Sequence, residues 1–405
     1  MNKYQFIDIV KKEDGFLRGP FGSALKKSLF VPKGVDTYKV YEQSTPLYQD
    51  EKLGNYYISK EYFDNSMYKF EAKPKDFLVS CSGVNYGAIY QLSDNAEKGV
   101  INQALLRIRL DNNIVDDDYF LYLFNSYIVK RITSGTGDST IPNFPPMSVV
   151  KAIEFDLPDL PTQKKIAKKI KCIDKKIVNN NKINLNLESL AKTVFDYWFL
   201  QFEFPNEKRK PYKSSGGKMI YNKIVKKEIP EGWEVKQLKD IVIENNKSKT
   251  QVGQVSNSGD YPFFTSGEEI LKSDKHIING NCCYLSTGGN ATLQHHVGKA
   301  DYSTDTWCIT ANNNLENYLY LYLKSILPMM DTKFFHGTGL KHLQKPLLLK
   351  EFVVIPDENI LKLFNNYLSK GFERQSLNYI ENQKLKGLKE FLLPMLMNNQ
   401  ITFSD

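Results

Sequence analysis

The stretch that decides the fold is residues 162–199, TQKKIAKKIKCIDKKIVNNNKINLNLESLAKTVFDYWF, which contains neither proline nor glycine. Its apolar residues recur with alternating spacings of four and three: Ile166, Ile170, Ile173, Ile177, Leu187, Ala191, Val194 and Trp198. This spacing is typical of a coiled-coil seam and predicts a long helix that packs against a second one. Its length, on the order of 50 to 60 Å at about 1.5 Å per residue, indicates a spacer.

A second breaker-poor stretch, residues 358–393, repeats the pattern when both are aligned on the proline before them. Its apolar residues fall at the same or neighbouring seam positions: Phe364, Leu368, Leu385, Leu388 and Leu392. Asparagines fill equivalent places in both stretches: Asn180 and Asn184 in the first, Asn378 and Asn382 in the second. Polar seam residues fix register, so we expect the two helices to pack against each other in one defined alignment. Gly371 and Gly387 lower helix propensity by roughly 1 kcal/mol each, which predicts a less regular second helix.

The rest of the chain is also a repeat of two halves, and segments of similar sequence occur in the same order in each. The pairs are FIDIV (6–10) with LKDIV (238–242), VSCSG (79–83) with YLSTG (284–288), YFLYL (119–123) with LYLYL (319–323), and EFDLP (154–158) with EFVVIP (351–356). Gly-Thr-Gly follows the third pair, at 135–137 and 337–339. The alternative is one large α/β domain that buries both helices, because seam residues alone do not identify their partner surface.

Composition narrows the class of protein. The chain has 405 residues, 41% of them hydrophobic, which favours two to three globular domains. Its formal net charge of +8 favours a polyanionic binding partner. No run of about 18 uncharged apolar residues exists, and the first residues lack a signal-peptide core, so the sequence predicts a cytoplasmic protein without a membrane span.

Five cysteines lack the C-x-x-C spacing of zinc ribbons and redox motifs: Cys81, Cys172, Cys282, Cys283 and Cys308. A zinc site built from some of these with His295 and His296 is one alternative. Adjacent Cys-Cys and His-His pairs point to opposite faces if they lie in strands, so we favour reduced, buried cysteines, surface histidines and no metal.

Four motifs now give the arrangement a family resemblance. They are GPFGSALKK at 19–27, LPDLPTQKKIAKKI at 157–170, FDYWFLQFEF at 195–204 and IPEGWEV at 229–235. In this order they resemble the specificity subunit of Type I restriction-modification enzymes over nearly the whole chain. Two departures are the missing IPEGW-like segment before residue 6 and the pair Thr162-Gln163 where the family usually has Glu-Gln.

The resemblance implies an α/β protein with two similar target recognition domains separated by two antiparallel coiled-coil helices in a pseudo-twofold repeat. The corresponding boundaries are 1–158 for the first recognition domain, 159–200 for the first spacer helix, 201–356 for the linker and second recognition domain, and 357–405 for the second helix and tail. Each domain is expected to read one half of a split double-stranded DNA target, with the helices as a ruler. The implied partners in this host-defence system are two modification subunits and a restriction subunit, which would use S-adenosylmethionine, ATP and Mg²⁺; this chain would bind no cofactor.

Catalytic motifs give little support to an enzyme. FHGTG at 335–339 superficially fits a methyltransferase cofactor loop, but it follows a helical segment rather than a strand. No phosphate-binding G-x-x-x-x-G-K-[ST] loop is present in the sequence. The alternatives to DNA reading are an assembly scaffold with incidental positive charge and a degenerate methyltransferase.

Candidate DNA contacts are polar and basic residues at turns, because such side chains bind phosphates and base edges. They are Arg18, Lys26, Lys27, Asn85, Ser134, Thr136, Ser139, Thr140 and Asn143 in the first half, and Ser286, Asn290, His336, Thr338, Lys341, His342 and Lys345 in the second. Residues 206–227 are expected to be a flexible connector. Aromatics at the first helix end exceed what a two-helix seam can bury and are candidates for partner docking: Phe195, Tyr197, Trp198 and Phe199.

Overall fold

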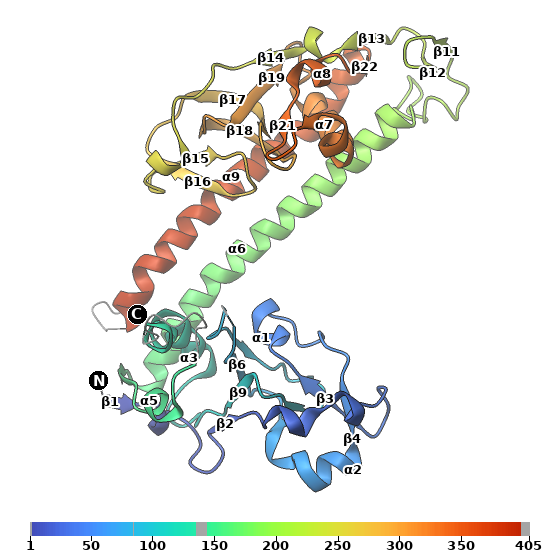
Figure 1. Cartoon of the computed structure of the whole chain (residues 1–405). Coiled ribbons are helices and arrows are strands. Elements are labelled where there is room, and N and C mark those ends of the chain that lie inside the picture. Colours follow the sequence, from blue (N-terminus) through green and yellow to red (C-terminus); the bar gives the residue numbers. More distant parts are fainter. Residues whose placement is uncertain (1, 84, 135–143, 398–405) are drawn as a thin grey trace. The chain divides into compact units, whose positions relative to one another are not determined.

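Both long helices are present in the computed structural model, which describes residues 2–83, 85–134 and 144–397 (Figure 1). Helix α6 spans Leu160–Phe195 and continues as a π-helical turn, Asp196–Leu200. Helix α9 spans Glu358–Met397 without interruption, so the expected irregularity at Gly371 and Gly387 does not occur. A Cβ atom at Gly371 would lie 3.5 Å from Leu187 Cδ2 of α6, an ordinary van der Waals distance, so close packing does not require glycine at this position.

The seam asparagines pair across the two helices as the repeat predicts. Asn180 Nδ2 donates to Asn382 Oδ1 at 2.9 Å, and Asn378 Nδ2 donates to Asn184 Oδ1 at 2.7 Å. The earlier residue of α6 meets the later residue of α9, so the helices run antiparallel, as Figure 1 also shows. The predicted alignment is therefore confirmed, and amide pairs define it.

By its contacts the chain divides into two compact units. The first unit is the chain up to Asp174 together with the segment from Gly387, and the second unit is Lys175–Lys386. Each long helix therefore contributes to both units.

The first unit contains two four-stranded sheets and a group of short helices. One sheet has the order β2-β9-β6-β7 and the other β4-β3-β8-β5. Their strands are β2 (Phe16–Arg18), β3 (Thr37–Tyr41), β4 (Tyr57–Ser59), β5 (Glu71–Ala72), β6 (Phe77–Ser80), β7 (Ile89–Gln91), β8 (Gly99–Ile101) and β9 (Leu105–Ile108). Helices α3 (Asp117–Leu123), α4 (Val129–Thr133) and α5 (Met147–Lys151) accompany them, and α1 (Ser44–Tyr48) and α2 (Lys60–Tyr62) lie earlier in the chain. Phe6, Phe77 and Phe120 are fully buried in its main core.

The second unit joins the equivalent strands into one six-stranded sheet of order β14-β19-β17-β18-β15-β16. Its strands are β14 (Val242–Glu244), β15 (Tyr261–Phe264), β16 (Ile270–Ser273), β17 (Ile278–Ser286), β18 (Leu293–Tyr302) and β19 (Thr306–Ala311). Helix α7 (Glu316–Lys333) corresponds to the α3–α4 segment, and α8 (Lys345–Leu349) follows the short hairpin of β20 (Phe335–His336) and β21 (His342–Leu343). The sheet is continuous because the ten-residue β18 stands where the first unit has two separate strands, β7 and β8.

The internal repeat is confirmed down to single hydrogen bonds. Strand β1 (Asn2–Gln5) pairs antiparallel with β10 (Glu154–Leu157), and β13 (Glu234–Gln237) pairs in the same way with β22 (Phe352–Ile355). A 3-10 turn follows β1 and another follows β13, and each turn is capped alike. The backbone N–H of Gln5 donates to Asp8 at 2.8 Å, and that of Gln237 donates to Asp240 at 3.1 Å.

Residues 206–227 are not the flexible connector that their composition suggested. They contain most of a hairpin formed by β11 (Met219–Asn222) and β12 (Lys227–Pro230). The Tyr212 ring stacks on Phe204 with 4.5 Å between centroids, and Phe204 stacks in turn on Trp233 at 4.9 Å. Burial of these rings orders the segment despite its glycine and serine content.

Candidate nucleic-acid interface

In both units, most of the turns that carry the predicted DNA contacts lie at one edge of a sheet. In the first unit β2 and β6 end at this edge, and their antiparallel neighbour β9 begins there. In the second unit β14 and β17 end where β19 begins. We call residues 18–27, 81–83, 85–88 and 102–104 the first turn cluster. Residues 245–254, 286–292, 303–305 and 335–345 form the second turn cluster.

Main-chain hydrogen bonds bring separate segments of the second turn cluster together. Gly289 N–H donates to Lys341 O at 2.9 Å, and Leu343 N–H donates to Thr287 O at 3.0 Å. His336 and His342 are paired across the β20–β21 hairpin. The predicted residues that become neighbours on these segments are exposed: Asn290, His336, Thr338, Lys341 and His342. Segments more than 50 positions apart in sequence thus form one polar surface.

Two predicted contacts in this cluster have other roles. Ser286 is fully buried; its hydroxyl donates to Asn290 O at 2.8 Å and accepts from Thr292 N–H at 2.9 Å. It therefore shapes the turn and is not accessible to DNA, so the prediction for this residue is wrong. Lys345 Nζ lies 3.5 Å from a Glu244 carboxylate oxygen and 4.6 Å from the centroid of the Trp307 ring, so its charge already has partners.

The first turn cluster is held by equally close packing. Gly19 N–H donates to Leu105 O at 2.9 Å, and Cys81 N–H donates to Ala104 O at 2.8 Å. A Cβ atom at Gly19 would lie 1.7 Å from Asn102 O, so only glycine fits this approach. The predicted residues Lys26, Lys27 and Asn85 are exposed in this cluster, and Ser134 is exposed at the end of α4. Thr136, Ser139, Thr140 and Asn143 lie outside the described residues.

Arg18 differs from the other basic residues because it is half-buried. Its guanidinium carbon lies 5.5 Å from the centroid of the Phe144 ring, and its Nη1 atom is buried without a hydrogen-bond partner in the part of the chain that the structure describes. Burial raises the pKa of the neighbouring Cys81 thiol to about 12, while the positive charge of Arg18 acts in the opposite direction. Arg18 is therefore better placed to support the cluster from beneath than to contact a phosphate at its surface.

The charge on both clusters is predominantly positive. The first turn cluster contains Arg18, Lys26 and Lys27 and no acidic residue. The second contains four lysines and one acidic residue: Lys247, Lys249, Lys341 and Lys345, and Asp305. The sequence interpretation missed Lys247 and Lys249, both of which are exposed. Their position directly after β14, which matches that of the Gly19–Lys27 motif after β2, could have identified them.

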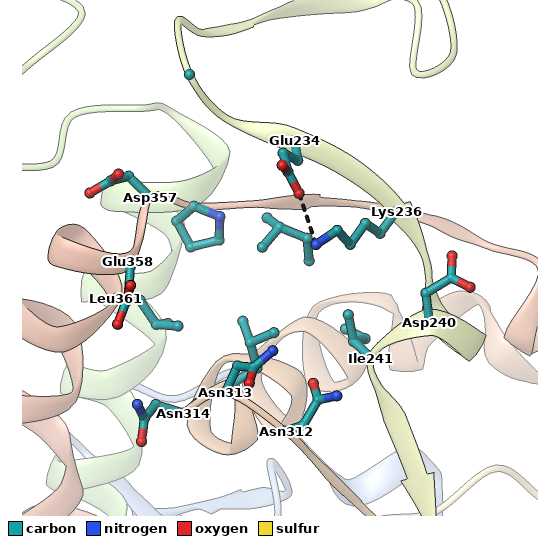
Figure 2. Close-up of a pocket in the computed structure, with 14 residues that line it drawn as sticks. Glu234, Lys236, Asp240, Ile241, Asn312, Asn313, Asn314, Asp357, Glu358 and Leu361 are labelled. Atoms are coloured by element: carbon teal, nitrogen blue, oxygen red, sulfur yellow. Dashed lines mark ion pairs between the residues drawn. The ribbon is translucent and has the colours of Figure 1, made fainter.

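A pocket elsewhere in the second unit has the opposite character (Figure 2). Its volume is about 540 Å³, and it lies where β13, β22 and the start of α9 meet. The acids Glu234, Asp240, Asp357 and Glu358 line it, and the lining lysine, Lys236, is paired with Glu234 at 2.8 Å. Excess negative charge makes this pocket unsuitable for a phosphate backbone.

The predicted docking aromatics are mostly core residues of the second unit. Phe195, Trp198 and Phe199 are buried, and Phe199 packs on Phe364 with 4.7 Å between ring centroids. The rings do exceed the two-helix seam, but sheet and helix residues of the second unit cover them, so Phe195, Trp198 and Phe199 are not accessible for partner docking. Tyr197 alone of the four is exposed, at 40%.

The cysteines and histidines of β17 and β18 form part of the packed sheet. Cys282 lies opposite His296 and Cys283 opposite His295, so the members of each pair point to alternate faces, as expected. The cysteines are buried as predicted except Cys172, which is exposed. The prediction of surface histidines is wrong for His296, which is 2% exposed. Among the described residues no group of three or more Cys, His, Asp or Glu side chains is arranged to hold a metal ion.

The fold therefore defines a protein with two copies of one mixed α/β domain, each with a basic turn cluster, and a pair of antiparallel helices. The family model of the Type I restriction modification DNA specificity domain matches residues 22–189 and 230–386. The chain belongs to this family, and its domain repeat corresponds to the two matches. Membership implies recognition of a DNA target and a non-catalytic subunit.

Known relatives agree along most of the chain. The specificity subunit of the Type I restriction enzyme MjaVIII from Methanocaldococcus jannaschii is 31% identical over 399 residues, covering 87% of this chain and 88% of the relative. The MjaIX specificity subunit of the same organism is 26% identical over 339 residues, covering 75% and 73%. The crystal structure of a Type I S subunit from M. genitalium has a TM-score of 0.59 at 16% identity, covering 100% of this chain and 96% of that one, which supports the fold. Over the part of the chain that the structure describes, no helix is long and apolar enough to span a membrane.

Proposed function

We propose that each unit reads one half of a bipartite double-stranded DNA target through its turn cluster. The observation that carries this proposal is the repetition of an exposed, mainly basic cluster at the same sheet edge in both units. Basic side chains supply phosphate contacts and set position, while exposed polar side chains supply contacts to base edges. In the second cluster the candidates for base contacts are Asn290, His336 and Thr338, and Lys341 is a candidate for phosphate.

The paired helices would then make target recognition depend on the gap between half-sites. Two weak readers on one rigid connection gain affinity only when both sites are reached together. The amide pairs of the seam support this role, because they hold one register of α6 against α9. The complete enzyme would add two modification subunits, which bind S-adenosylmethionine, and a restriction subunit that uses ATP and Mg²⁺; this chain directs their methylation and cleavage to the target.

The decisive test is to assemble the full chain with its modification subunits in the host and to map N6-methyladenine across the genome. A split asymmetric motif with a fixed gap is the expected result. Substitution of Asn290, His336 or Thr338 by alanine should relax or change one half of the motif and leave the other half intact. A methylome that does not change when this gene is deleted would favour the scaffold alternative and remove the basis for the DNA contacts.

Salt dependence gives an independent test of the phosphate contacts. Lys26→Ala and Lys341→Ala should each weaken DNA binding and lower the slope of log affinity against log salt by about 1. The matched controls are Lys3→Ala in the first unit and Lys218→Ala in the second, since both lysines are exposed, lie outside the clusters and pair with a glutamate at 2.7 Å and 2.6 Å. Equal slopes for cluster and control variants would contradict the assignment.

A further inference from the structure

The first turn cluster contains one exposed residue that charge and hydrogen bonding do not explain. The Phe21 side chain is 89% exposed, and no other aromatic side chain of the described residues is as exposed. A single exposed apolar residue is common on protein surfaces. Phe21 differs because it projects from the same ten-residue segment as Arg18, Lys26 and Lys27, which carries no acidic residue.

The backbone around Phe21 is fixed on both sides. Before it, the N–H of Gly19 donates a hydrogen bond to Leu105 O, and Pro20 is buried. After it, a Cβ atom at Gly22 would lie 2.5 Å from Gln103 Oε1, and Ala24 O accepts from the Tyr62 hydroxyl at 2.7 Å. The ring therefore extends from an anchored turn, so little conformational freedom would be lost if it bound a partner.

The positive surroundings favour DNA as that partner. In a double helix the faces of the bases are covered by their neighbours, and a phenyl ring has no group that forms hydrogen bonds with base edges. Such a ring gains a large apolar contact by entering between two stacked base pairs, as apolar side chains of several DNA-bending proteins do. We propose that Phe21 is an apolar wedge that enters a base-pair step of the half-site read by the first unit. This inference rests on the proposed DNA-reading function.

The second unit provides an internal comparison. In the first unit the 3-10 turn Gly22–Leu25 follows β2 and Phe21. In the second unit the 3-10 turn Val252–Gln254 follows β14, and the exposed apolar residue there is Val252 at 41%. Valine is too short to separate base pairs as a phenyl ring does. Unstacking is therefore expected at the step that faces Phe21 and not at the step that faces the equivalent turn of the second unit; Leu340, which is 65% exposed, lies on a different segment of the second cluster.

The test uses the full chain assembled with its modification subunits and a duplex that carries the motif found by methylome mapping. 2-Aminopurine replaces one base at a time in each half-site, and its fluorescence rises where stacking is lost. The wild-type complex should produce a rise at one step of the first half-site. Phe21→Ala should abolish the fluorescence rise and weaken DNA binding about tenfold without changing the salt slope. Phe21→Trp should keep the fluorescence rise and the wild-type affinity.

The matched control is Tyr68→Ala, which removes another exposed aromatic ring of the first unit, outside the turn cluster. Tyr68 also has basic neighbours, because it precedes Lys69, whose carbonyl oxygen accepts from Arg107 Nη1. Its DNA binding should equal that of the wild type. If the wild type binds the motif selectively and Phe21→Ala binds equally well, the wedge is refuted while the proposed function stands. The wedge is also refuted if Phe21→Ala weakens binding in a way that depends on a thymine methyl group while no fluorescence rise is seen. It is refuted as well if Phe21→Ala weakens subunit assembly in the absence of DNA. A wild type that shows no selectivity refutes the proposed function itself.

Discussion

Removal of Asn180 should destabilise the second unit more than any exposed asparagine does. Asn180 is fully buried and donates to Asn382 Oδ1 at 2.9 Å and to a Glu381 carboxylate oxygen at 2.8 Å. Loss of the buried bond to Asn382 costs about 1 kcal/mol, whereas the Glu381 side chain is partly exposed to solvent and also paired with Lys176 at 3.3 Å, so water can replace the donor that it loses. The stranded Asn382 oxygen adds about 1 kcal/mol, part of which the loss of the unpartnered Asn180 Oδ1 atom offsets. We expect Asn180→Ala to lower the free energy of unfolding by about 1 to 2 kcal/mol.

Tryptophan fluorescence measures this unit selectively. The three tryptophans of the chain, Trp198, Trp233 and Trp307, all belong to Lys175–Lys386. Guanidinium unfolding of the full chain followed by this signal should show the lower midpoint at an unchanged slope. The matched control is Asn179→Ala, the same substitution at the exposed neighbouring position, which should change stability by less than about 0.7 kcal/mol.

A double-mutant cycle then isolates the pair. Asn180→Ala and Asn382→Ala together should cost less than the sum of the single variants by about 1 kcal/mol or more. The reasoning is refuted if Asn180→Ala behaves like Asn179→Ala, or if the two substitutions are additive, because the amide pair would then contribute nothing to the helix alignment.

Three further predictions follow from single side chains. Gln163 is buried in the first unit, accepts from Asp116 N–H at 2.9 Å and donates to Ile114 O and Pro158 O at 3.0 Å. Gln163→Leu should lower the free energy of unfolding of this unit by about 2 to 4 kcal/mol, measured by thermal unfolding followed with circular dichroism. An unchanged melting curve would contradict this role of Gln163. His296 has a pKa lowered by burial to about 4, so the unfolded chain takes up a proton first and stability falls as pH drops from about 6.5 to 4. Its share is about 2 kcal/mol between pH 7 and pH 5, so His296→Gln should flatten the tryptophan-detected pH profile, and parallel profiles would rule this out. Gly19→Ala should displace the first turn cluster from Asn102 and weaken DNA binding by the first unit, and wild-type affinity in a filter-binding assay would exclude that geometry.

The sequence by itself determined the architecture. The four-three spacing of residues 162–199 and the recurrence of asparagines at matching seam positions predicted two long helices packed in one defined alignment, and the family resemblance implied that they run antiparallel. The repeated segments predicted two copies of one domain. These features were readable because they depend on periodicity and order along the chain, which need no knowledge of distant contacts.

Only the tertiary structure decided which polar residues of the turns are accessible. Ser286 and Asn290 are both polar residues of one turn. The Ser286 hydroxyl is buried and forms its hydrogen bonds within that turn, whereas the Asn290 side chain is exposed. Likewise the aromatics at the end of α6 resembled a docking surface until the sheet and helices of the second unit were seen to bury them. Burial depends on contacts between residues far apart in sequence, and the local sequence pattern does not reveal these contacts.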